Sequence, residues 1–256
     1  MRIRLLRHAT LILEYAGKRL LVDPMLGEAG SMDPVQNSPN PRRNPLVPLS
    51  VPLADAIRDL DAVLVTHTHR DHWDATAAEI LRKDLPLFGQ PPDHGKFVSQ
   101  GFTKPNSVQA TLSWNGISIS RTGGQHGKGE IGRRMAPVSG YVLHAKGEPA
   151  LYIAGDTIWC AEVRDALLEH RPEVSIVNAG AARFLEGDPI TMTAEDVITV
   201  CKVAPFTRVV AVHMEAFNHC LLTRDDLRFQ LEAERVLDRV RIPADGEQWS
   251  ESPLLK

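Results

Sequence analysis

Three histidines and two aspartates fall within eight consecutive positions, from His67 to Asp74, in the segment VTHTHRDHWD. The whole chain of 256 residues contains only 10 histidines, so this concentration needs an explanation. Imidazole and carboxylate groups are the ligands that zinc, manganese and iron accept in proteins. The residue types and their spacing therefore predict a metal site.

The elements around this segment would hold the side chains at the end of a strand. Residues 61–65 form an apolar run that predicts a buried strand, and residues 74–83 predict a helix with Asp74 as its N-cap. The loop between them lies where α/β folds place their ligands. It carries four candidate ligands: His67, His69, Asp71 and His72. A loop this short cannot surround a metal ion alone, so further ligands must come from elsewhere.

Three more candidates follow other apolar runs, each after a predicted strand: His126, Asp156 and His213. Taken singly, a histidine in this position is more often an ordinary core or surface residue, and Asp156 can cap the helix that follows it. The same arrangement recurs at several strands, however. This recurrence favours one metal site over a separate explanation for each residue.

Composition excludes several classes of protein. The chain is 43% hydrophobic and 24% charged, and no window reaches the roughly 18 to 20 apolar residues of a membrane helix. The formal net charge is −3 with both signs mixed along the chain, which argues against a nucleic-acid partner. Three cysteines, odd in number and widely spaced, fit the reduced thiols of a cytoplasmic protein, and the first residues do not resemble a signal peptide.

The order of predicted elements indicates one α/β domain spanning residues 1–256. Strands are expected within the first 23 residues, followed by a long loop over residues 23–52. Two hairpins are expected around Asn115-Gly116 and Lys146-Gly147. The second half reads as β-α units, with helices expected over residues 160–170, 193–204 and 223–240.

The chain resembles the metallo-β-lactamase superfamily over nearly its whole length. THTHRDH matches the His-x-His-x-Asp-His signature of that family, and HATLILEYAGKRLLVDP looks like its opening strands. Within the superfamily, the chain is most similar to the L-ascorbate-6-phosphate lactonase-like hydrolases. The resemblance implies a four-layer αββα sandwich, of mixed α/β (α+β) class, with the site at one edge between two sheets.

The family pattern also implies two divalent metal ions. The first would be held by His67, His69 and His126, the second by Asp71, His72 and His213, and Asp156 would bridge both. Zinc is the first expectation, with manganese and iron as alternatives, because histidine and aspartate serve all three. His69 stands where flavodiiron relatives carry Glu, and Asp156 where several β-lactamases carry Cys. These differences argue against redox chemistry and against β-lactamase activity.

The expected activity is that of a binuclear metallo-hydrolase. A metal-activated hydroxide would attack a small ester, lactone or phosphoester. Asp71 is the expected catalytic residue, because it can orient the hydroxide and carry its proton away. Two alternatives stay open: a phosphodiesterase acting on a cyclic or small nucleotide, and a non-catalytic, metal-stabilised binding protein.

Substrate-binding residues are harder to predict. Arg42 and Arg43 lie in a Pro-rich loop before the metal-site strand and are expected to hold an anionic group of the substrate; an exposed, solvated pair is the alternative. His219 is expected to line the pocket, and His8 to support a metal ligand. The expected partner is a small molecule, anionic if the arginines bind it, and not a membrane.

Overall fold

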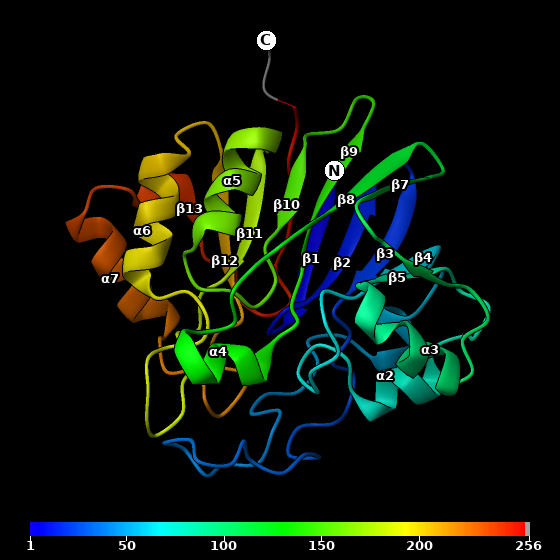
Figure 1. Cartoon of the computed structure of the whole chain (residues 1–256), viewed down its shortest axis with the longest axis horizontal. Helices are drawn as coiled ribbons and strands as arrows, with labels where there is room; N and C mark the ends of the chain where they lie inside the picture. The colour runs from blue at the N-terminus through cyan, green and yellow to red at the C-terminus, as the bar shows by residue number, and fades with distance from the viewer. Residues whose placement is uncertain (254–256) are drawn as a thin grey trace.

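The computed structural model describes residues 1–253, which contain two seven-stranded sheets packed face to face (Figure 1). The first sheet contains β1 (Arg2–Arg7), β2 (Thr10–Tyr15), β3 (Lys18–Val22), β4 (Ala62–Leu64), β5 (Leu87–Gly89), β6 (Pro105–Ser107) and β14 (Gln248–Ser250). The second contains β7 (Thr111–Trp114), β8 (Ile117–Thr122), β9 (Gly140–Ala145), β10 (Leu151–Ile153), β11 (Val174–Asn178), β12 (Arg208–Val212) and β13 (Val240–Arg241). Their spatial orders are β14-β1-β2-β3-β4-β5-β6 and β13-β12-β11-β10-β9-β8-β7.

Helices cover the outer face of each sheet. The first sheet is covered by α1 (Leu53–Ala56), α2 (Ala75–Ile80) and α3 (His94–Ser99), and the second by α5 (Ala161–His170), α6 (Ala194–Val203) and α7 (Arg224–Ala233). Figure 1 shows α2 and α3 on one side of the paired sheets and α5, α6 and α7 on the other. The result is the predicted four-layer order.

Strand sequences explain why both faces of each sheet are buried. In β2, Leu11 and Leu13 pack into the core between the sheets, whereas Ile12 points to the core beneath α2 and α3. Successive side chains of a strand alternate between its faces, so a nearly continuous apolar run supplies both cores. One core lies between the sheets, and one lies under each helical layer.

The strand directions bring several loops to the same edge. In the first sheet β1, β3 and β4 run in one direction, and in the second β8, β10, β11 and β12 do so. The long connection between β3 and β4 runs along the edge where α4 (Gly129–Met135) also lies (Figure 1). The residues that follow these strands therefore meet at one edge.

Two predicted helices end earlier in the structure. The helix expected over residues 74–83 is capped by Asp74 but ends at Ile80, because Leu81 has an extended backbone with a ψ of 138°. The helix expected over residues 223–240 ends at Ala233, because Arg235 adopts a left-handed φ of 58° and the Val236 amide donates to the Leu231 carbonyl. A short 3-10 helix, Leu237–Arg239, and β13 follow. The helix α4 was not predicted. Among residues 1–253, no helix has the length and apolar character needed to cross a membrane.

Candidate metal centre

Seven predicted ligands and His8 come together at the edge described above. They arrive from the loops after β1, β4, β8, β10 and β12. Their ligand atoms form three overlapping groups, in each of which the atoms lie within 4.8 Å of one another: His67, His69 and His126; His67, His72 and Asp156; and His8, Asp71, His72 and His213. The first and third groups match the two ligand sets implied by the family resemblance, with His8 added to the second set.

Asp156 lies between the two sets. Its Oδ2 atom is 3.4 Å from His126 Nε2 and 3.2 Å from His72 Nε2, while its Oδ1 atom is 3.2 Å from His213 Nε2. One carboxylate thus contacts histidines of both sets. This is the position that a bridging ligand must occupy.

Other separations also fit ligands that face a shared cation. His67 Nε2 lies 2.9 Å from His69 Nδ1, and His72 Nε2 lies 3.2 Å from His213 Nε2. Metal–ligand distances of about 2.0–2.2 Å place neighbouring tetrahedral ligands about 3.3 Å apart. The donors are imidazole nitrogens and carboxylate oxygens, which suit a divalent transition metal. The residues present therefore fit a bound cation.

Hydrogen bonds on the outer side of the cluster fix two of these imidazoles. The His72 Nδ1 atom lies 2.8 Å from Asp23 Oδ2, and the His126 Nδ1 atom lies 2.8 Å from the Ile190 carbonyl oxygen. Each Nδ1 donates in these bonds, so Nε2 is the ring nitrogen that faces the centre. Such outer hydrogen bonds are typical of metal-binding histidines.

Burial and charge set the protonation of the cluster without metal. Burial lowers the pKa of His126 to about 4, so this imidazole is neutral at pH 7. Burial also disfavours the charged form of His72, but the carboxylates of Asp156, Asp23 and Asp71 outweigh it and raise its pKa to about 10. The His72 side of the centre therefore holds a proton, which a bound cation must displace.

Two supporting residues were missed by the sequence analysis. Asp23 accepts hydrogen bonds from the Thr66 amide at 2.7 Å and hydroxyl at 2.8 Å as well as from His72. Asn178 donates to Asp156 Oδ1 at 2.7 Å. Asp23 directly follows β3 and Asn178 ends β11, so the rule that found the ligands applies to them too.

His8 supports two ligands, in agreement with its predicted place. Its Nε2 atom lies 3.3 Å from Asp71 Oδ2, and its ring centroid lies 3.6 Å from that of His213. Its carbonyl accepts a hydrogen bond from the His213 amide at 2.8 Å. His8 has a left-handed φ of 57°, which turns the chain sharply after β1 and directs the ring toward the cluster.

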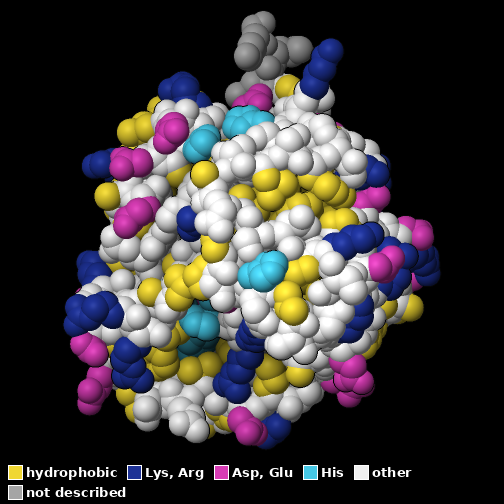
Figure 2. All heavy atoms as spheres, turned by 45° about the vertical axis from the view of Figure 1, so that its right-hand side comes forward, with side chains coloured by type: hydrophobic (Ala, Val, Ile, Leu, Met, Phe, Trp, Pro, Cys, Tyr) yellow, Lys and Arg dark blue, Asp and Glu magenta, His cyan; other side chains and the backbone are white. Residues whose placement is uncertain are grey.

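A cavity of about 470 Å³ opens onto the cluster. It is lined by Asp33, Pro34, Val35, Gln36, His69, Arg70, Asp71, His126, Met135, Phe184, Phe217 and His219. On the face drawn in Figure 2, a histidine side chain is visible in a hollow bordered by hydrophobic side chains. Three of the candidate ligands thus reach a space large enough for a small molecule.

Of the three predicted substrate-binding residues, one lies in the cavity wall and two do not. His219 lines the cavity, as predicted. Among residues 1–253, the lining includes neither Arg42 nor Arg43; both are exposed, and Arg43 pairs with Asp33 and donates to the Gly30 carbonyl. A substrate role for this pair stays a prediction, and Arg70 is the arginine on the cavity wall.

The fold and the cluster define a protein of the metallo-β-lactamase class. Residues 18–214 match the family described as Beta-lactamase superfamily domain. The UPF0173 protein YddR of Bacillus subtilis (strain 168) is 35% identical over 256 residues, covering 98% of this chain and 100% of the relative. The chain belongs to the UPF0173 family of metal-dependent hydrolases within the metallo-β-lactamase superfamily.

Two solved structures are similar along nearly their whole length. The isothiocyanate hydrolase from Delia radicum gut bacteria has 38% sequence identity and a TM-score of 0.93, covering 98% of this chain and 100% of its own. A possible metal-dependent hydrolase from Veillonella parvula DSM 2008 has 33% identity and a TM-score of 0.94, covering 97% and 98%. These similarities confirm the predicted fold. The resemblance to the lactonase-like branch stays a prediction.

Proposed function

We propose that this protein is a binuclear metal-dependent hydrolase that cleaves a small electrophilic molecule in the cavity beside His69 and Asp71. The position of Asp156 carries the proposal, because its carboxylate contacts histidines of both ligand sets. Relatives named metal-dependent hydrolases support the same class of enzyme.

Each residue has a defined part in this proposal. One ion would be held by His67, His69 and His126, the other by Asp71, His72 and His213, and Asp156 would contact both. Bound divalent cations lower the pKa of a coordinated water and polarise a carbonyl or phosphoryl oxygen. Asp71 lines the cavity, so its carboxylate is placed to take up a proton from the attacking water. The buried His219 imidazole is placed to hydrogen-bond the reacting group.

The best-supported substrates are small esters, lactones and isothiocyanates. The isothiocyanate is favoured by the similar hydrolase from Delia radicum gut bacteria. In that reaction water adds to the central carbon of R–N=C=S, the C–N bond then breaks, and an amine and carbonyl sulfide are released. Lactones and esters present a comparable electrophilic carbon.

Phosphoesters, including small nucleotides, are the second candidate class. Arg70 lines the cavity and, among residues 1–253, has no carboxylate partner; its guanidinium lies over the Phe217 ring, 5.8 Å from the centroid. An arginine in this position can bind an anionic group.

A hydrolysis screen tests the proposal. Metal-replete protein is incubated with esters, lactones, isothiocyanates and phosphodiesters, beside metal-depleted protein and the Asp156→Ala variant. Turnover by the metal-replete wild type alone is the expected result. If that protein retains its metal and turns over none of the four classes, the hydrolase proposal is rejected and the alternative of a metal-stabilised binding protein is favoured.

A further inference from the structure

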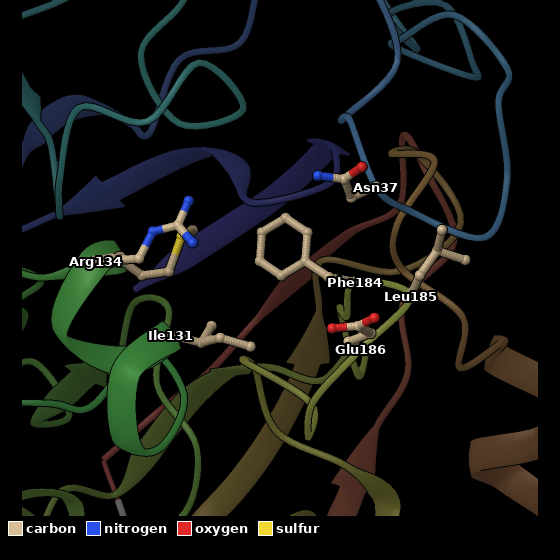
Figure 3. Close-up of a pocket in the computed structure, with 7 residues that line it drawn as sticks. Asn37, Ile131, Arg134, Phe184, Leu185 and Glu186 are labelled. Atoms are coloured by element: carbon tan, nitrogen blue, oxygen red, sulfur yellow. The ribbon is translucent and has the colours of Figure 1, made fainter.

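A second cavity of about 480 Å³ adjoins the one at the metal centre. It is lined by Asn37, Ile131, Arg134, Met135, Phe184, Leu185 and Glu186 (Figure 3). Met135 and Phe184 line both cavities. The two cavities therefore share part of their walls at these side chains.

We propose that the outer cavity binds an uncharged apolar arm of the substrate, aromatic or aliphatic, while the electrophilic group lies against the metal centre. This inference rests on the proposed function and names the substrate class more closely. It makes Phe184, Met135 and Leu185 specificity-determining residues.

The side chains of the outer cavity favour an apolar, uncharged occupant. Ile131, Met135, Phe184 and Leu185 provide hydrocarbon, aromatic and thioether surface. Figure 3 shows the Phe184 ring projecting into the middle of the space. Arg134 and Glu186 contribute one charge of each sign, so the lining has no net charge.

Leu185 supplies an independent indication that this wall is a binding surface. Its relative exposure is 64%, which is high for a large apolar residue that lines a concave site. An apolar arm bound beside it would remove this surface from water, at a gain of roughly 25 cal/mol per Å² buried. Exposed apolar surface in a groove beside a reactive centre is typical of ligand sites.

The outer wall is also connected to the metal centre through the chain. The Leu185 amide donates to the Asn37 carbonyl at 2.6 Å, which joins the segment 184–190 to the long loop between β3 and β4. Ile190, at the end of that segment, accepts the hydrogen bond from His126 Nδ1. The same segment therefore shapes the outer cavity and positions a metal ligand.

Binding of a neutral apolar fluorophore tests the inference without catalysis. We expect N-phenyl-1-naphthylamine to bind the metal-replete wild type, and the Leu185→Asp variant to bind it about tenfold more weakly or worse. The matched control is Leu168→Asp, which changes another exposed leucine, 48% exposed on α5 and absent from the outer-cavity lining. The control should bind as the wild type does. No binding by the wild type, or equal binding by the two variants, overturns the inference.

A pair of esters provides the kinetic test. For Leu185→Asp, kcat/KM should fall about tenfold or more with p-nitrophenyl octanoate and change by no more than about twofold with p-nitrophenyl acetate. Equal losses on both esters would overturn the inference. If the wild type turns over neither these esters nor any compound of the screen, but binds the fluorophore in the Leu185-dependent manner, the proposed hydrolase function fails and the apolar site stands.

Discussion

Asp156 had two explanations in the sequence, a helix cap or a metal ligand. The N-cap of α5 is Cys160, and no side chain caps that helix, so the structure gives Asp156 no capping role. Its carboxylate instead contacts both sets of histidines. A residue shared by two ions should affect both when it is removed.

We therefore expect Asp156→Ala to lower metal content and hydrolytic activity together, as measured by elemental analysis and turnover of the same preparation. Thr223→Ala is the control, because the Thr223 side chain accepts from the Asp226 amide and caps α7. It should cost about 1 kcal/mol of stability and leave the metal content unchanged. A variant at position 156 that keeps two metals and normal turnover would refute the bridging role.

Asp23 should raise the affinity for metal through its hydrogen bond with His72, although it is not itself a predicted ligand. Replacing it by Asn removes the negative charge that holds the His72 Nδ1 proton, so we expect metal binding to weaken about 10–100-fold. Competition with a chromogenic chelator measures this change. Asp61→Asn is the matched control: Asp61 accepts from the Arg19 amide at 2.9 Å, away from the cluster. An unchanged metal affinity in Asp23→Asn would show that Asp23 merely shapes the loop.

The functional side chains that the sequence predicts are those that follow a buried strand. A polar residue that follows an apolar run can be recognised in the sequence alone, and all seven candidate ligands have this position. Asp23 has it equally, but the stretch that begins at this residue is rich in Pro, Asn, Ser and Gly and predicts a long loop. Arg42 and Arg43 could not be placed, because the path of a long irregular loop depends on contacts that only the folded chain provides.

Arg7 holds part of that loop in place. Its buried guanidinium donates to the carbonyls of Met25, Gly27 and Val47, at both ends of the segment that carries Asp33 into the cavity wall. Burial lowers the pKa of Arg7 to about 10, with partial compensation by Asp74, so it stays charged at neutral pH. This loop belongs to neither sheet, so its position depends on side-chain contacts such as the hydrogen bonds from Arg7.

We expect Arg7→Met to destabilise the protein by about 3 kcal/mol or more, because three buried carbonyls lose a charged donor. Urea unfolding measures the loss. The control Arg2→Met removes an exposed arginine paired with Glu14 and should change stability by about 1 kcal/mol or less. Equal effects of the two substitutions would exclude the role assigned to Arg7.

Helix ends were less predictable than helices. Apolar residues recur four positions apart within α7, at Leu227 and Leu231, and again beyond its end, at Val236 and Val240, and neither Gly nor Pro marks the end. The left-handed turn at Arg235 is a consequence of packing, since Val236 and Val240 contribute to the core beneath the helices in a 3-10 helix and a strand. Periodicity identifies a buried face but does not fix the backbone that presents it.

The metal centre joins the two halves of the molecule. The loops after β1 and β4 belong to the first sheet, and those after β8, β10 and β12 to the second, so bound cations would cross-link the sheets. The three apolar cores lie elsewhere and do not include the cluster. Removal of metal should therefore loosen the junction without unfolding either half.

This arrangement leads to a prediction about metal number and stability. After metal-replete purification, elemental analysis should give more than one transition-metal ion per chain, because two sets of ligands surround Asp156. Free metal at about 100 times Kd stabilises a folded protein by about 2.7 kcal/mol per site. For a chain of this length, chelation should then lower Tm by about 5–10 °C for each ion lost, while the far-UV circular dichroism at room temperature stays unchanged. A hydrolase that is fully active with one ion or none would rule out the binuclear centre, and loss of secondary structure on chelation would show that the cores alone do not hold the fold.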